Sequence, residues 1–355
     1  MAQLTVDIEK LARNIRFLVR SCKAAGLDMM GILKGPGPDS AIIRTMRENG
    51  IETFGFSSIP RTGTHDETLP QKPVFISLPS IHQIPRMVRL FGTSLNSEIS
   101  VIQRINEVLV AENRSHNIIL MVDTGDLREG VLPENVVDTV RKIHDIRDRR
   151  LGFSGIGTNL GCCAGMVPDE ENVLILQDLA LEIETRLGIA VETVSVGGSV
   201  FLEWLKSHGL PDRINQIRLG EAIFLGNIPA FCRKHEHLHD DVLIFKGDVL
   251  ETQEKNVGPC PHSGVDALGF SPVAAFKGKR KRAILNFGIS DTYPLGLRPL
   301  DGGVFIVCVN SNYTVIDYTD SQRSLKAGDF VEFKMNYISM LQAFMSPFTD
   351  IVYHY

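Results

Sequence analysis

Lys34 ends an apolar run, residues 29–33, and is followed at once by Gly35 and Pro36. An apolar run closed by turn residues predicts a buried strand that ends near this lysine. An amine held against apolar surroundings loses part of its preference for the charged form, so it becomes a better nucleophile toward an aldehyde or ketone. A lysine can equally end a strand with its ammonium in water, so the reactive interpretation needs support from other residues.

Two later segments could bind an anion and a polar ring. Gly197, Gly198 and Ser199 end an apolar run and precede a helical pattern. Glycines that open a helix leave backbone N–H groups free for an anion such as phosphate, although the segment could also be a simple turn. Arg218 lies within another apolar run, where an unpaired guanidinium is costly. It therefore needs a partner, either a structural carboxylate such as Glu221 or a ligand.

Polar side chains follow two further predicted strands. Residues 123–130 combine charges with glycines, which favours either a pocket rim or a loop held by pairing of Asp123 with Arg128. Asn159 offers hydrogen bonds without charge at the end of the next strand. The adjacent pair Cys162-Cys163 is predicted to pack or to line a site rather than to form a bridge.

The elements that must position these side chains alternate in type along residues 28–226. The runs predicted as strands are 28–34, 53–58, 73–79, 93–97, 116–125, 151–160, 193–198 and 216–226. Helical patterns cover 8–24, 39–49, 98–112, 134–147 and 170–187. This alternation predicts an α/β protein built on a (β/α)₈, TIM-like barrel. A doubly wound sheet is disfavoured because the chain has no early G-x-G-x-x-G.

The remainder of the chain predicts a β-rich C-terminal domain. Its short apolar runs are 242–250, 282–287, 303–309, 313–317 and 330–333, with few helical patterns between them. We assign residues 1–230 to the barrel domain and 241–355 to the second domain, to which residues 1–8 could add a strand. The polar segment 227–241 is predicted to be a linker.

Composition limits the partners of the protein. The chain of 355 residues has a net charge of −5, which argues against nucleic acid or an anionic membrane as partner. We find no secretory signal and no apolar stretch long enough to span a bilayer. Six cysteines without paired C-x-x-C spacing predict reduced thiols and a cytoplasmic protein.

Taken together, an amine, an anion site and a buried guanidinium at one barrel mouth suit a phosphorylated aldehyde. Because active sites of such barrels lie at the carboxyl ends of the strands, these groups are expected to meet. Pyridoxal 5'-phosphate fits, with its aldehyde on Lys34, its phosphate on residues 197–199 and its ring nitrogen toward Arg218.

On these residues the chain resembles the fold-type III pyridoxal-phosphate enzymes, the alanine racemase group, and within that group the ornithine racemase branch. The string VDTGDLREG at 122–130 is the most specific element of the resemblance. The other matching segments are 6–8, 31–34, 155–160, 197–199, 218–221, 225–227, 264–267, 280–285, 328–329 and Tyr337.

The resemblance implies that Lys34 carries the cofactor and serves as one of two proton-transfer bases. It also implies a homodimer whose active sites are shared across the interface. Arg218 would face the pyridine nitrogen, and the phosphate would be held by residues that include Tyr337. The residues assigned to cofactor binding are Lys34, Arg128, Asn159, Gly197, Gly198, Ser199, Arg218, Gly220, Glu221 and Tyr337.

One position departs from the resemblance. Alanine racemases place a catalytic tyrosine where this chain has Ile289, which cannot transfer a proton. A racemase needs an acid/base on each face of the α-carbon, so a second group is required. Asp266 has the best support from the resemblance and is predicted to be catalytic together with Lys34. The other candidates are Cys260, His262, Asp291, Tyr293 and Tyr313.

The predicted function is a pyridoxal-phosphate-dependent racemase that interconverts L- and D-amino acids, on ornithine or another non-alanine substrate. The alternatives are a fold-type III lyase related to D-threonine aldolase or D-serine dehydratase, and a non-catalytic pyridoxal-phosphate-binding protein. No metal site is predicted, because residues 235–239 are expected to be solvated and the spacing of Cys260 and His262 is a weak signal.

Overall fold

The computed structural model describes residues 1–59, 72–231, 233–258, 264–265, 269 and 276–355. These residues form two compact units. One consists of Met1–Leu11 together with His239–Tyr355, and the other of Ala12–Leu238. The chain passes from the first unit into the second within helix α1 (Ile8–Ala24).

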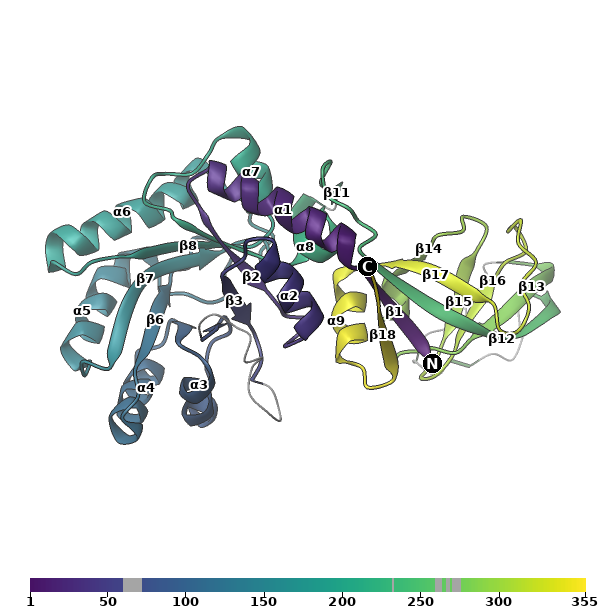
Figure 1. Cartoon of the computed structure of the whole chain (residues 1–355), viewed down its shortest axis with the longest axis horizontal. Helices are drawn as coiled ribbons and strands as arrows, with labels where there is room; N and C mark the ends of the chain where they lie inside the picture. The colour runs from purple at the N-terminus through teal and green to yellow at the C-terminus, as the bar shows by residue number, and fades with distance from the viewer. Residues whose placement is uncertain (60–71, 232, 259–263, 266–268, 270–275) are drawn as a thin grey trace. The chain divides into compact units, whose positions relative to one another are not determined.

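The unit Ala12–Leu238 is a closed barrel of parallel strands (Figure 1). The predicted (β/α)₈ barrel is therefore confirmed. The strand predicted at 216–226 is wrong beyond residue 219, because residues 221–225 form the short helix α8 (Glu221–Leu225). Periodicity alone does not distinguish a short buried helix from a buried strand. The barrel strands are β2 (Asp28–Ile32), β3 (Thr53–Phe56), β4 (Val74–Phe75), β5 (Thr93–Asn96), β6 (His116–Met121), β7 (Leu151–Asn159), β8 (Thr193–Gly197) and β9 (Gln216–Leu219).

Helices with one buried face surround the barrel strands. In helix α2 (Ser40–Glu48) the side chain of Asp39 caps the first turn by accepting from the Ile42 N–H at 2.9 Å. A capping box of Asp169 and Asn172 begins α6. The other helices of this unit are α3 (Ile84–Leu90), α4 (Ile99–Glu112), α5 (Val136–Ile146), α6 (Glu170–Leu187) and α7 (Phe201–Ser207), with 3₁₀ turns η1 (Ile81–Gln83) and η2 (Pro133–Asn135).

The inward face of the barrel explains the position of Lys34. Met30 and Ile32 of β2 belong to one buried apolar cluster, together with Val74 of β4. The pairing of β2 with β3 continues one residue further, since the Leu33 N–H donates to the Gly55 carbonyl at 2.9 Å. Because side chains alternate along a strand, Lys34 continues the face of Met30 and Ile32 at the carboxyl end of the barrel.

The other unit is β-rich, as predicted. Its described residues form a sheet of eight strands, in which β1 (Ala2–Asp7) lies between β12 and β18. Phe287 packs edge-on against Phe245 and Phe333 in the core of this unit. The elements are β12 (Leu243–Val257), β13 (Gly278–Leu285), η4 (Pro294–Gly296), β14 (Leu297–Pro299), β15 (Phe305–Val309), β16 (Thr314–Asp317), β17 (Phe330–Met335), α9 (Tyr337–Met345) and β18 (Thr349–His354).

The segment 227–241, predicted to be a linker, contains the boundary between the two units, at Leu238 and His239. It contains an antiparallel hairpin of β10 (Asn227–Ile228) and β11 (Arg233–Lys234), with the 3₁₀ turn η3 (Pro229–Phe231) between them. Across the described residues, no helix is both long and apolar enough to cross a membrane.

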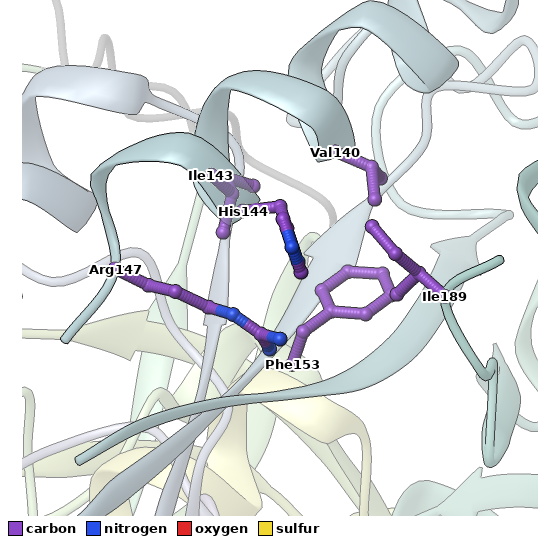
Figure 2. A pocket seen from close by; sticks show the side chains of 6 residues that line it. All are labelled: Val140, Ile143, His144, Arg147, Phe153 and Ile189. Carbon is purple, nitrogen blue, oxygen red and sulfur yellow. The ribbon is translucent and has the colours of Figure 1, made fainter. Parts of the chain in front are cut away.

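A small pocket lies on the barrel unit, and Figure 2 shows the side chains that line it. Phe153 contributes from the beginning of β7, and most other lining residues come from α5 or from the turn that follows it. This is the amino end of the strands, whereas barrel enzymes hold their chemistry at the carboxyl end. The pocket is lined by Val140, Ile143, His144, Arg147, Phe153 and Ile189.

Candidate active site

The Lys34 amine is electrostatically perturbed. Its side chain is exposed by surface area, yet desolvation by the surrounding protein lowers the pKa of the amine below the usual 10.5. Cys162 and Glu129 oppose this shift, whereas the positive charges of Arg128 and Arg218 add to it. A lowered pKa leaves more of the amine neutral at neutral pH, which is the form that attacks a carbonyl.

Arg218 of β9 is a buried guanidinium that forms no ion pair with any residue the structure describes. It is 5% exposed. Its Nη1 donates to Ser195 Oγ at 2.6 Å, and its Nη2 donates to the Thr158 carbonyl at 2.5 Å. No carboxylate of the described residues lies within 4.0 Å of it, and burial lowers its pKa to about 10. The alternative of a structural pair with Glu221 is therefore wrong, since the Glu221 carboxylate instead accepts from Asn227 at 2.8 Å.

The chain after β8 packs tightly against this arginine. A Cβ atom added at Gly197 would lie 2.5 Å from Arg218 Nη2, so no side chain fits there. Two residues later the buried Ser199 hydroxyl accepts from the Ala222 N–H at 3.1 Å, which ties the end of β8 to the beginning of α8. Around Gly198 no heavy atom lies within 4 Å of an added Cβ, so its backbone is open on that side.

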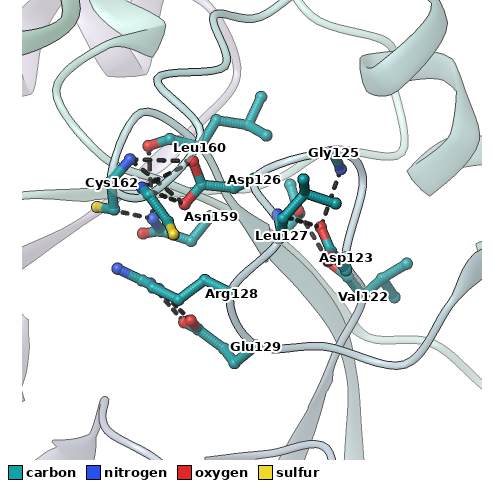
Figure 3. Close-up of polar contacts among 12 residues, drawn as sticks. Val122, Asp123, Gly125, Asp126, Leu127, Arg128, Glu129, Asn159, Leu160 and Cys162 are labelled. Atoms are coloured by element: carbon teal, nitrogen blue, oxygen red, sulfur yellow. Dashed lines mark hydrogen bonds and ion pairs between the residues drawn. The ribbon is translucent and has the colours of Figure 1, made fainter.

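The loop after β6 presents Arg128 (Figure 3). Asp123 Oδ1 accepts from the N–H groups of Gly125 at 2.9 Å and Leu127 at 3.1 Å. Leu127 has a left-handed backbone with φ of 54°, which is rare for a residue with a side chain. Arg128 follows it and forms a two-point ion pair with Glu129, which raises the pKa of the guanidinium. The proposed pairing of Asp123 with Arg128 is wrong.

The loop after β7 brings a thiol beside the same arginine. With its amide oxygen turned toward Arg128, Asn159 accepts from Arg128 Nη2 and from the next backbone N–H, both at 3.2 Å. The same end of the amide lies 3.1 Å from Cys162 Sγ. Asp126, 3% exposed, accepts from the Cys162 N–H with both carboxylate oxygens, at 3.1 and 3.3 Å (Figure 3).

The barrel unit thus brings together several residues that the sequence predicted far apart in the chain. Hydrogen bonds, close packing and electrostatic interactions connect these residues in the folded chain. Tyr337 begins α9 in the other unit, and Glu221 begins α8 after Gly220. The predicted residues that meet around the end of β9 and the neighbouring loops are Lys34, Arg128, Asn159, Gly197 and Arg218.

Candidates for the second proton carrier have different outcomes. Asp266, Cys260 and His262 lie outside the described residues. Asp291 is buried, and its Oδ2 accepts from the Gly288 N–H at 2.9 Å. Desolvation raises the pKa of this carboxyl group. Its hydrogen bond to a backbone N–H three residues earlier stabilises a turn. Tyr313 is exposed on the strand-rich unit.

Several residues that hold or complete this cluster were not predicted from the sequence. Glu129 was part of the quoted string but received no role, and Cys162 was assigned to packing or lining. Asp126 binds the Cys162 N–H and Ser195 binds Arg218, and in each pair the two residues are more than 20 positions apart in the sequence. A signal for Cys162 was present, because it follows Asn159 by three residues at a strand end, where barrel enzymes place functional groups.

The described thiols and acids do not form a metal site. No group of three or more His, Cys, Asp or Glu side chains in the described part of the chain is arranged to hold an ion. The described cysteines, Cys22, Cys162, Cys163 and Cys308, are all free thiols.

A (β/α)₈ barrel with a lysine at the end of a strand, followed by a β-rich unit, is the architecture of the fold-type III enzymes. Comparisons with known proteins identify the family. The alanine racemase N-terminal domain matches residues 6–228. The chain therefore belongs to the alanine racemase family, and the resemblance noted from its motifs is confirmed.

Two relatives match nearly the whole chain. The chain is 30% identical over 349 residues to the ornithine racemase of Acetoanaerobium sticklandii, covering 98% of each protein. It is 32% identical over 352 residues to the lysine racemase of Thermotoga maritima, covering 99% of this chain and 98% of that one. The solved alanine racemase from Streptomyces coelicolor A3(2) superposes with a TM-score of 0.73 at 15% identity, covering 99% of this chain and 97% of that structure. At that identity the structural likeness concerns the fold alone.

Proposed function

We propose that the protein is a pyridoxal-phosphate-dependent amino-acid racemase whose substrates are diamino acids such as ornithine and lysine. The observation that carries the proposal is the Lys34 amine, which stands at the carboxyl end of β2 with a lowered pKa. Two full-length relatives named ornithine racemase and lysine racemase support the reaction and the substrate class. An alanine-type tyrosine does not follow Lys34, which suits a substrate larger than alanine.

The side chains at the barrel mouth fit this cofactor. Lys34 offers the amine that an aldehyde requires, and Arg218 offers a buried guanidinium that no described carboxylate neutralises. The open space around Gly198 suits a backbone that a ligand can approach closely. When bound, the cofactor would supply electron withdrawal from the α-carbon of an attached amino acid, which acidifies the α-proton.

Each of the site residues then has a proposed role. Lys34 would bind the cofactor through its amine and, once an amino acid has replaced it there, would remove or return the α-proton on one face. Arg218 would donate to the ring nitrogen and keep it unprotonated. Arg128 and Asn159 would bind the cofactor at the rim of the barrel, beside Lys34. Glu129 holds Arg128 in place through their ion pair.

The phosphate is proposed to lie against the loop ends after β8 and β9. Gly198, Ser199 and Gly220 would donate backbone N–H groups, and Tyr337 would add a hydroxyl. Glu221 begins α8 beside Gly220, and desolvation raises the pKa of its carboxyl group; the family resemblance assigns it to the same phosphate site.

The assembly and compartment are proposed from the family resemblance and the composition. We infer a cytoplasmic homodimer in which each active site uses residues of both subunits. Sedimentation velocity would test the dimer. Mixing two inactive variants with lesions in different units would test shared sites, because only shared sites regain activity on mixing.

The proposal is tested with purified protein supplied with pyridoxal phosphate. L-Ornithine, L-lysine and L-alanine are each incubated in heavy water, and α-deuteration and enantiomer ratio are followed by NMR and chiral chromatography. We expect both signals with the diamino acids. Lys34→Ala should abolish the visible absorbance of bound cofactor and both signals, whereas Lys142→Ala, an exposed lysine on α5, should behave like the parent.

Retained racemisation in Lys34→Ala would contradict the role of the lysine. A keto-acid or aldehyde product would identify a lyase instead. Bound cofactor without deuteration of any of the three amino acids would indicate a binding protein.

A further inference from the structure

The proposed racemase requires a second proton carrier, and the position that holds the tyrosine in the alanine racemase group is Ile289. We propose that the Cys162 thiol is this second carrier and exchanges the α-proton on the face opposite Lys34. This inference rests on the proposed function and assigns a catalytic role at the same site.

The first support is the placement of the thiol within the cluster. Cys162 Sγ lies 3.1 Å from the Asn159 amide, which in turn contacts Arg128 (Figure 3). Cys162 also lies close enough to Lys34, Arg128 and Arg218 to interact with each of them electrostatically. The buried, carboxylate-free guanidinium of Arg218 is a second sign that the cluster binds a ligand.

The second support is the topology of the barrel. Lys34 follows β2 and Cys162 follows β7, and the strands β8 and β9 lie between them around the closed ring. The two loops therefore rise from different parts of the rim, with the end of β9 between them. A ligand held above Arg218 of β9 would have Lys34 on its β2 side and Cys162 on its β7 side, and the proposal assigns these two sides to the two faces of the α-carbon. A two-base reaction requires this arrangement.

The third support is the chemistry of the other groups. The guanidinium groups of Arg128 and Arg218 stay protonated at neutral pH, even with the pKa of Arg218 lowered to about 10, and the Asn159 amide is neither an acid nor a base there. Glu129 is occupied by its two-point pair with Arg128. Of the side chains that the structure shows beside Lys34, this leaves the thiol of Cys162, a group type that enzymes use as a general acid or base.

The backbone around the thiol is held in place. Asp126 accepts from the N–H groups of Cys162 and Cys163 with both carboxylate oxygens. Gly161 precedes them with a left-handed backbone, φ 75°, that turns the chain sharply after the end of β7. A catalytic group needs its position fixed, and these contacts fix the main chain on which the thiol stands.

The proton balance of the step is complete. In one direction of turnover the Cys162 thiolate takes the α-proton, so that the C–H bond breaks, an S–H bond forms and the electron pair stays on the α-carbon. The Lys34 ammonium then gives its proton to the other face and becomes a neutral amine. The reverse turnover, or exchange with water, returns both groups to their starting states.

The experiment compares Cys162→Ala, Cys162→Ser and Cys163→Ala, each loaded with pyridoxal phosphate. Cys163 is the matched control, because it is the adjacent exposed thiol and its N–H also binds Asp126. We expect both Cys162 variants to keep the visible absorbance of the cofactor and to lose racemisation by about 100-fold or more. In heavy water, each should still deuterate one enantiomer of the diamino acid through Lys34 and not the other. Cys163→Ala should match the parent.

Several outcomes overturn the inference. Racemisation by Cys162→Ala at the parental rate would exclude the thiol, and loss of racemisation in Asp266→Asn alone would transfer the role to that residue. Loss of exchange for both enantiomers, or loss of cofactor in both Cys162 variants, would reduce Cys162 to a structural residue. A parent protein without any racemisation would instead refute the proposed function, and this inference with it.

Discussion

Arg218 Nη1 donates to Ser195 Oγ across 2.6 Å, and both side chains are buried inside the barrel. Ser195 also donates from its hydroxyl to Gln216 Oε1 at 2.8 Å, so these side chains form a short polar chain between β8 and β9. A guanidinium held by a hydroxyl and a carbonyl, rather than by a carboxylate, keeps its full positive charge available to a ligand. The barrel tolerates this charge because neutral acceptors accept hydrogen bonds from some of the N–H groups of the guanidinium.

Ser195→Ala is expected to destabilise the folded protein. The substitution leaves a buried N–H of Arg218 without its acceptor, which costs about 1–3 kcal/mol in free energy of unfolding. Urea unfolding of the cofactor-free protein measures the effect. Ser207→Ala, at an exposed helix end, is the control and should leave the midpoint unchanged. Equal midpoints for the two variants would show that the bond does not stabilise the fold.

His116 is expected to make stability depend on pH. It is 2% exposed and lies between Ser94 Oγ at 2.8 Å and the Phe91 carbonyl at 3.2 Å. Desolvation lowers its pKa from 6.5 to about 4. The folded state therefore binds fewer protons than the unfolded state between these values, and stability increases with pH in that window. The contribution is fully present above the unfolded pKa and is lost as pH falls toward the folded one.

The expected loss for this histidine is about 2 kcal/mol between about pH 7 and about pH 5. Denaturant unfolding at the two pH values measures it. His116→Gln removes the titrating group. Between the same two pH values, the free energy of unfolding of this variant should therefore fall by about 2 kcal/mol less than that of the parent. Parallel pH dependence in parent and variant would mean that His116 does not titrate differently on folding.

The main chain of the barrel could be predicted because its signals are local. Each strand is a short apolar run, and the position of Lys34 follows from one such run closed by glycine and proline. Helix ends were also visible, as in α6, whose predicted bounds agree with the structure. The end of β9 was misplaced because residues 222–225 continue the apolar run while the backbone becomes helical.

The partners of the site residues could not be predicted, because they are set by folding over long sequence separations. Arg218 meets Ser195 and the Thr158 carbonyl from two other strands. Asp126 binds backbone groups of Cys162, and no periodicity in the sequence encodes a contact between a side chain and a distant main chain. The sequence could indicate that Arg218 needs a partner, but it could not say that the partner is neutral.

Asp126→Asn is expected to loosen the loop that carries Cys162. An amide offers one accepting oxygen where the carboxylate offers two, and its NH₂ group would face the N–H donors of Cys162 and Cys163. We expect faster alkylation of Cys162 by iodoacetamide, measured by mass spectrometry of the peptide, together with slower racemisation. Glu134→Asn, at an exposed position in η2, is the control. An unchanged alkylation rate would show that Asp126 does not hold this loop.

Leu127→Gly is expected to relieve strain at the residue that precedes Arg128. Leu127 is 74% exposed and has φ of 54°, so its side chain gains little from burial while its backbone is held in the left-handed region. That conformation costs a residue with a Cβ about 1–2 kcal/mol, and glycine does not pay it. The fair comparison is with Leu127→Ala, which loses the same contacts but keeps the Cβ. Leu127→Gly should be more stable than Leu127→Ala by about 1 kcal/mol in urea unfolding. Its catalytic rate should nevertheless fall, because a glycine lets the chain that presents Arg128 explore more conformations. If the alanine variant were the more stable of the two, the left-handed turn would not be a source of strain.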